Sequence, residues 1–174
     1  MKYYVNADGR YLGGWDAEPP EGAVEVESAP SDARQPWLGD GWGDIPAEPI
    51  TTAAVDAERN RRISTGFEFG GHIFQSRLPD GVNPGDWEVF SGKALEALIA
   101  VMGGAQTGDL RWSDPDEDFA WIAADNSRVP MDAQTVIELG KAASAHRSRC
   151  TFAGSDLKAK SPIPADYSDD KWWP

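Results

Sequence analysis

The chain has 174 residues, of which 40% are hydrophobic, and carries a formal net charge of −13. This is enough for one domain with a buried core, or for one domain plus an appendage. So negative a chain repels phosphate backbones and anionic lipid surfaces, which argues against binding to nucleic acid or to a membrane surface. The single cysteine, Cys150, excludes an internal disulfide. With no run of about 20 apolar residues and no apolar N-terminal signal, we expect a protein that is made in the cytoplasm and is used without passing through a secretion machine.

Residues 1–28 predict a small antiparallel β meander. Residues 2–6 alternate aromatic and polar side chains, residues 7–9 form a turn, and the chain returns along residues 10–13. Residues 23–27 are the third candidate strand. Three short strands bury little apolar surface, so we expect this meander to pack on something else.

Residues 29–50 have the composition of a linker, because prolines and glycines recur along them. Trp37 and Trp42 lie inside this segment. A free linker would leave both indole rings in water, which is unfavourable for such large apolar groups. Two interpretations stay open: both rings fold back on their own domain, or both anchor a neighbouring subunit.

Residues 51–160 predict an α+β module in the order helix, β-hairpin, helix, β-hairpin, helix. The first helix is capped by Thr51 or Thr52 and ends at Gly66. Three arginines lie near the C-terminal end of this helix: Arg59, Arg61 and Arg62. Their positive charge complements the helix dipole. The alternative interpretation is that the three arginines contact a phosphate or a carboxylate. The first hairpin covers residues 66–74 around a Gly-Gly turn.

After a loop over residues 78–86, the second helix is predicted over residues 92–102, opened by Ser91 and stopped by Gly103. Four large apolar residues share one face of this helix: Leu95, Leu98, Ile99 and Met102.

The remaining elements are a strand at residues 110–112, a tryptophan-containing hairpin at residues 119–130, and a third helix capped by Asp132. The inward positions of that helix are predicted from their spacing: Val136, Leu139, Gly140, Ala143 and Cys150. Residues 161–174 form a tail that is rich in proline and aspartate and ends in Trp172 and Trp173.

No catalytic or metal-binding constellation stands out. His146 and Cys150 are one helical turn apart, but a structural zinc site needs four ligands at characteristic spacing. The acidic run at residues 114–118 lacks the glycine and closing glutamate of an EF-hand loop. The chain has no nucleophile-elbow motif and no phosphate-binding loop motif. We therefore expect no enzymatic activity, no cofactor and no metal.

Two segments resemble a known domain: Gly-Phe-Glu-Phe-Gly-Gly-His-Ile-Phe at residues 66–74, and the stretch from Trp-Ile-Ala-Ala-Asp-Asn-Ser-Arg-Val-Pro through the third helix at residues 121–146. Together with their order, they are similar to a domain of unknown function borne by tailed bacteriophages, over roughly residues 57–158. That domain commonly lies at the C-terminal end of tail-fibre and tail-fibre-assembly proteins. The resemblance implies a phage-tail setting and supplies no catalytic residues.

The sequence thus favours a structural component of a tailed phage particle, at the tail tip, fibre or spike attachment region. It would act through protein–protein contacts with other tail or fibre proteins, in several copies around a symmetric tail. The expected partner-binding residues are the tryptophans outside the module: Trp37, Trp42, Trp172 and Trp173. A tail-fibre assembly chaperone and a carbohydrate-binding host-recognition protein are the alternatives.

Overall fold

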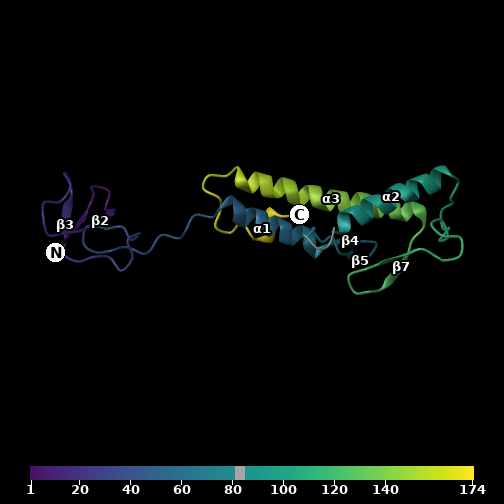
Figure 1. The fold of residues 1–174 in the computed structure, drawn as a ribbon, viewed down its shortest axis with the longest axis horizontal. Helices are drawn as coiled ribbons and strands as arrows, with labels where there is room; N and C mark the ends of the chain where they lie inside the picture. The colour runs from purple at the N-terminus through teal and green to yellow at the C-terminus, as the bar shows by residue number, and fades with distance from the viewer. Residues whose placement is uncertain (81–84) are drawn as a thin grey trace. The chain divides into compact units, whose positions relative to one another are not determined.

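The structure is a computed structural model that describes residues 1–80 and 85–174. The chain divides into two compact units, Met1–Glu48 and Pro49–Pro174. In Figure 1 the first unit is coloured purple to blue, and the second runs from blue through green to yellow. The predicted α+β class is confirmed, with an antiparallel three-stranded sheet, three α-helices and two hairpins. Of the loop predicted at residues 78–86, residues 81–84 lie outside the described part of the chain.

The first unit is built on strands β1 (Lys2–Val5), β2 (Tyr11–Trp15) and β3 (Val24–Val26). Their order is β2-β1-β3, and both pairings are antiparallel. The central strand therefore carries the buried side chains of Tyr4 and Val5. Such a small sheet needs further cover to be stable.

That cover comes from the segment expected to be a linker. The backbone N–H of Trp37 donates to the Gly9 carbonyl (2.8 Å), and Trp37 forms an isolated β-bridge with Trp42. Gly9 has a φ of 77°, and a Cβ at this position would overlap the carbonyl oxygen of Trp37. Residues 29–48 are thereby tied to the sheet of their own unit.

The second unit contains helices α1 (Thr52–Thr65), α2 (Asp86–Met102) and α3 (Ala133–Lys158). Both α1 and α2 pack against α3, at different parts of its length (Figure 1). Two predicted caps are confirmed: the Thr51 side chain accepts from the Ala54 N–H, and Asp132 accepts from the Thr135 N–H. The start predicted for the second helix is wrong, because α2 begins at Asp86, and the Ser91 hydroxyl donates to the Trp87 carbonyl (2.9 Å) inside the helix. Gly66 ends α1 with a φ of 94°.

Two hairpins connect the helices. Strands β4 (Phe67–Phe69) and β5 (His72–Phe74) form the first, and β6 (Ala120–Ile122) and β7 (Arg128–Pro130) form the second. The two are joined where the Ala124 N–H donates to the Ile73 carbonyl (2.8 Å).

The strand predicted at residues 110–112 is wrong, because this segment is a turn. The Asp109 carboxylate accepts from the Arg111 N–H (2.9 Å), an Asx-type bond that competes with strand pairing. The Trp112 indole N–H then donates to the Met131 carbonyl (3.0 Å).

The second unit has two apolar clusters. The larger one lies between α2, α3 and the hairpins and includes Phe74, Phe90 and Leu139. The smaller one joins α1 to the end of α3 and to the C-terminal segment, through Val55, Leu157 and Trp173. A 3-10 turn, η1 (Asp170–Trp172), precedes Trp173, so the predicted tail is packed on α1 and α3.

Candidate functional site

The inner side of α2 is fixed by two contacts. Phe90 and Ala97 are buried in the larger cluster. On the side towards α3, a Cβ placed at Gly140 would stand only 2.7 Å from the Ala94 Cβ, which shows how closely the two helices approach. The rotation of α2 about its axis is therefore determined by its packing.

The opposite side of α2 is apolar and exposed. Leu95 is 59% exposed, Leu98 45%, Ile99 62% and Met102 81%. We call these four residues the outer face of α2. They are the stripe that the sequence marks as the apolar side of this helix, yet the core-facing positions are Phe90 and Ala97. Large apolar groups at three- and four-residue spacing form one continuous strip on a helix.

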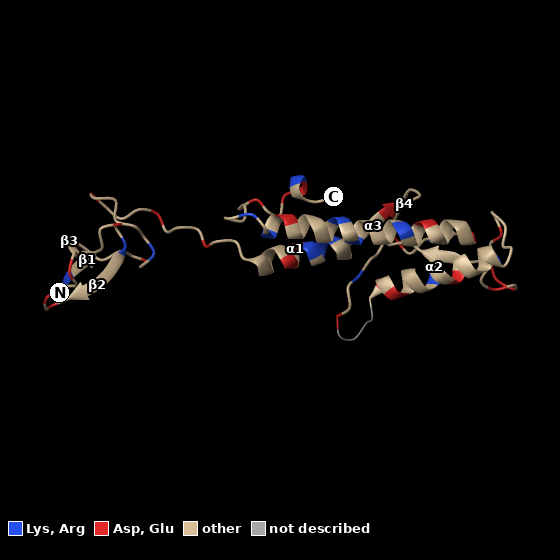
Figure 2. Cartoon of the chain, turned by 90° about the horizontal axis from the view of Figure 1, so that it is seen from above, with Lys and Arg blue, Asp and Glu red and all other residues tan. Residues whose placement is uncertain are grey.

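The end of α2 also lacks charge. No Lys, Arg, Asp or Glu occurs from residue 97 to residue 108, and the C-terminal part of α2 is accordingly drawn in tan in Figure 2. A helix that is apolar all round is usually buried. The largest contiguous apolar patch exposed on a protein is often functional. Another molecule covering this face would remove the unfavourable exposure.

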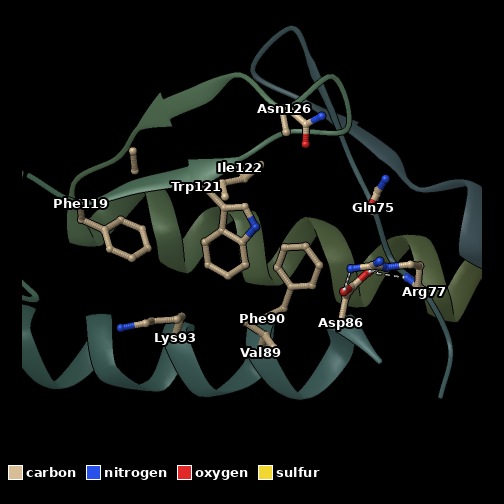
Figure 3. Close-up of a pocket in the computed structure, with 12 residues that line it drawn as sticks. Gln75, Arg77, Asp86, Val89, Phe90, Lys93, Phe119, Trp121, Ile122 and Asn126 are labelled. Carbon is tan, nitrogen blue, oxygen red and sulfur yellow. Dashed lines mark hydrogen bonds and ion pairs between the residues drawn. The ribbon is translucent and has the colours of Figure 1, made fainter. Parts of the chain in front are cut away.

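Beside this helix lies a pocket of about 480 Å³, between α2, the β6 strand and the segment that follows β5 (Figure 3). Its wall contains an aromatic pair: the rings of Phe90 and Trp121 are stacked, with 4.8 Å between centroids and 3° between planes. The pocket is lined by Gln75, Arg77, Asp86, Val89, Phe90, Lys93, Phe119, Ala120, Trp121, Ile122, Ala123 and Asn126.

The charged groups of the pocket are already paired. Arg77 donates to both carboxylate oxygens of Asp86 (3.1 Å each), and these bonds raise the pKa of the guanidinium. Lys93 donates to Glu96 (2.8 Å) and to Ser113 (3.2 Å). The described lining contains no histidine, cysteine or serine. A planar or apolar group would be the best match for this pocket.

The four tryptophans expected to bind partners make contacts within the chain. Trp37 and Trp42 are half-buried and lie edge to face, 5.3 Å between centroids. The Trp42 indole N–H donates to the Ser28 carbonyl (3.1 Å). These contacts correspond to the interpretation in which both rings fold back on their own domain.

At the other end of the chain, Trp172 is half-buried and donates to Asp166 (3.1 Å). Trp173 is only 7% exposed, and its indole N–H donates to the Tyr167 carbonyl (2.7 Å). Trp173 therefore has its partners within the chain, in contrast to the expectation that it contacts a neighbouring polypeptide. The physical reason is the apolar gap between α1 and α3, which the indole fills together with Val55 and Leu157.

The arginine cluster of α1 is likewise paired internally. Arg59 bonds Asp56 (2.7 Å) and Arg61 bonds Glu58 (2.6 Å). Arg62 bonds both Glu58 and Asp170 (2.7 Å each). These three arginines therefore already bind carboxylates of the chain itself, and a phosphate or carboxylate ligand would have to compete with those carboxylates.

Neither metal candidate gains further ligands in the structure. The Nε2 atom of His146 lies 3.2 Å from the Arg62 carbonyl oxygen and 4.0 Å from the Cys150 sulfur. Over residues 1–80 and 85–174, no group of three or more potential ligands is placed to hold a metal ion. In the same ranges, none of the helices combines the length and apolar character needed to cross a bilayer.

Sequence reasoning did not single out the outer face of α2 as a binding surface, nor the pocket. A signal for the outer face exists, since the run Ala-Leu-Ile-Ala-Val-Met at residues 97–102 is apolar on every side of a helix. For the pocket no such signal exists, because its residues come from three separate segments.

A protein-family model matches the chain. No curated protein and no solved structure is significantly similar to the chain. The match is to a family model described as "Domain of unknown function (DUF4376)", over residues 46–170. It covers most of the chain and all three helices, and the chain therefore belongs to the DUF4376 family.

Proposed function

We propose that this chain is a structural component of a tailed bacteriophage particle, at the tail tip, fibre or spike attachment region, and that it works by binding other proteins. The observation that carries the binding role is the outer face of α2, four large apolar side chains that the second unit itself does not cover. The phage setting rests on the resemblance of residues 66–74 and 121–146 to a domain of tail-fibre and tail-fibre-assembly proteins.

A protein partner suits this face better than a small ligand does. The strip is convex, because it runs along the outside of a helix, whereas small-molecule sites are concave. It offers apolar contact and few polar groups, which is the character of an interface core. A complementary apolar helix or sheet face is the partner chemistry that it fits.

Composition analysis of purified particles tests this function. We expect wild-type chain in stoichiometric amounts by quantitative mass spectrometry of mature particles. Leu98→Lys places a charge in the centre of the outer face and should reduce incorporation at least about tenfold, because burying an unpaired ammonium is unfavourable. Phe152→Lys is the matched control, since Phe152 is 69% exposed on α3.

The outcomes separate the candidate roles. Wild-type chain missing from mature particles, but bound to fibre protein during assembly, would identify a transient assembly chaperone instead. Equal incorporation of the Leu98→Lys and wild-type chains would exclude the outer face as the contact.

A further inference from the structure

We infer that the outer face of α2 binds the same face of a second copy of this chain, as an antiparallel helix pair about a two-fold axis. This partner assignment rests on the proposed function, since it names one of the protein contacts through which the chain acts. The antiparallel α2 pair is argued from charge, from symmetry and from size.

Charge decides where two such acidic chains can meet. With a net charge of −13, two copies repel each other over most of their surfaces. The segment from residue 97 to residue 108 holds no charged residue. Leu98, Ile99 and Met102 lie in this segment, and the Glu96 carboxylate next to Leu95 is paired with Lys93 (2.8 Å). Two copies that meet there avoid direct contact between like charges, and at an ionic strength of 0.15 M screening over about 8 Å weakens the remaining repulsion.

The spacing of the strip suits a two-fold axis. An axis passing between Leu98 and Ile99 sets Leu98 against Ile99 of the second copy, and Leu95 against Met102 of the second copy. Each contact then joins side chains of similar size, and each is made twice, as an isologous interface requires. Antiparallel helices also align their dipoles favourably.

Size sets the strength of the pair. A strip of four side chains offers a few hundred Å² per copy, less than the ~800 Å² per partner of a standard stable interface. We therefore expect a dimer that dissociates on dilution, with a Kd on the order of micromolar. Repeated copies held close together in an assembly would strengthen the same contact by raising its effective concentration.

Sedimentation equilibrium of the full chain, over roughly 1 to 200 μM around that expected Kd, tests the pair. Wild-type and Phe152→Lys chains should dimerise with the same Kd. Leu98→Lys and Ile99→Glu chains should each dimerise at least about tenfold more weakly, because each buries unpaired charges in the pair. Circular dichroism melting of every variant verifies that the fold is retained; both substituted side chains are exposed.

Mixing the two charged variants tests the orientation. In the antiparallel pair, the lysine at position 98 of one chain faces the glutamate at position 99 of the other, so the mixture should form a heterodimer. A parallel pair sets position 98 against position 98 and gains no such ion pair. Failure of the mixture to associate, with wild-type chain dimeric, would overturn the antiparallel arrangement.

A wild-type chain that stays monomeric throughout would overturn the self-pairing. The proposed function would survive that result if Leu98→Lys still removed the chain from particles, because the outer face would then bind a different protein or a different part of the same chain. Both ideas would fail together if the chain were monomeric and Leu98→Lys were incorporated normally.

Discussion

The indole ring of Trp121 lies flat on the phenyl ring of Phe90, with 4.8 Å between the ring centroids. Trp121 belongs to β6 and Phe90 to α2, so this stack attaches the second hairpin to the inner side of α2 (Figure 3). Because α3 packs on the adjoining side of α2, the outer face is the side of α2 that the second unit leaves uncovered. The exposure of Leu98 and its neighbours follows from this packing.

Replacing Phe90 by alanine should destabilise the second unit strongly. Phe90 is 2% exposed, and removing a buried phenyl group leaves a cavity as well as losing the stack, which costs about 3 to 5 kcal/mol. Urea denaturation followed by far-UV circular dichroism measures the loss. Ile122→Ala is the control, because Ile122 is 60% exposed in the second hairpin, the one that carries Trp121. It should cost less than about 1 kcal/mol of unfolding free energy. Similar losses for the two variants would contradict the packing described.

Gly140 is predicted to be required for the close approach of α2 and α3. Gly140→Ala should lower the free energy of unfolding, although alanine is the better helix former by about 1 kcal/mol, because the new Cβ would meet the Ala94 Cβ at 2.7 Å. Adding Ala94→Gly to this variant should restore part of the loss. A stabilising Gly140→Ala change would show that the helices separate without cost.

Trp173 should contribute to stability through the smaller apolar cluster. Trp173→Ala removes a 7% exposed indole that lies under the Arg62 guanidinium, 5.4 Å from it, and should cost about 3 kcal/mol or more. Trp172→Ala, next to it and half-buried, is expected to cost clearly less. Thermal melts of both variants provide the comparison. Equal small effects would mean that the C-terminal segment does not pack on α1.

Acid should weaken the α1 network through Glu58. Hydrogen bonds from Arg61, and then from Arg62, lower the pKa of the Glu58 carboxyl to about 2, against an ordinary value of 4.5. A carboxyl with a lowered folded-state pKa stabilises the fold fully above pH 4.5, and this stabilisation is lost as the pH falls towards 2. Its size should be on the order of 1 to 3 kcal/mol, because Arg61 is partly solvated.

The unfolding free energy of wild type and Glu58→Gln, measured between pH 7 and pH 2, tests this linkage. The difference between the two should be largest near neutral pH and should shrink below pH 4.5. Glu138→Gln removes an exposed pair with Lys141 and serves as the control, with a small difference throughout. A Glu58→Gln difference that does not change with pH would refute the role of this network.

The sequence predicts the elements of this fold well where their signals are local. Thr51 and Asp132 bond backbone groups three residues away, and the Gly-Gly turn of the first hairpin is decided within four residues. The strand expected at residues 110–112 does not form, because the Arg111 N–H donates to the Asp109 carboxylate, and this hydrogen bond is equally local.

Long-range packing could not be predicted in the same way. The spacing of Leu95, Leu98 and Ile99 indicates an apolar face, but not whether that face meets the protein's own core. The answer depends on Phe90 stacking on Trp121, a residue from another element. The position of Trp173 depends equally on a gap between two helices distant in sequence.

The most direct test of the central claim is the accessibility of the outer face of α2 in the assembled state. A cysteine at Ile99→Cys can be labelled with a maleimide in the dilute chain and in purified particles, while the native Cys150 is 1% exposed and contributes little background. We predict that labelling at position 99 slows at least about tenfold in particles, and that labelling of Phe152→Cys keeps its rate. Equal labelling rates at position 99 in both states would contradict the claim that this face binds protein.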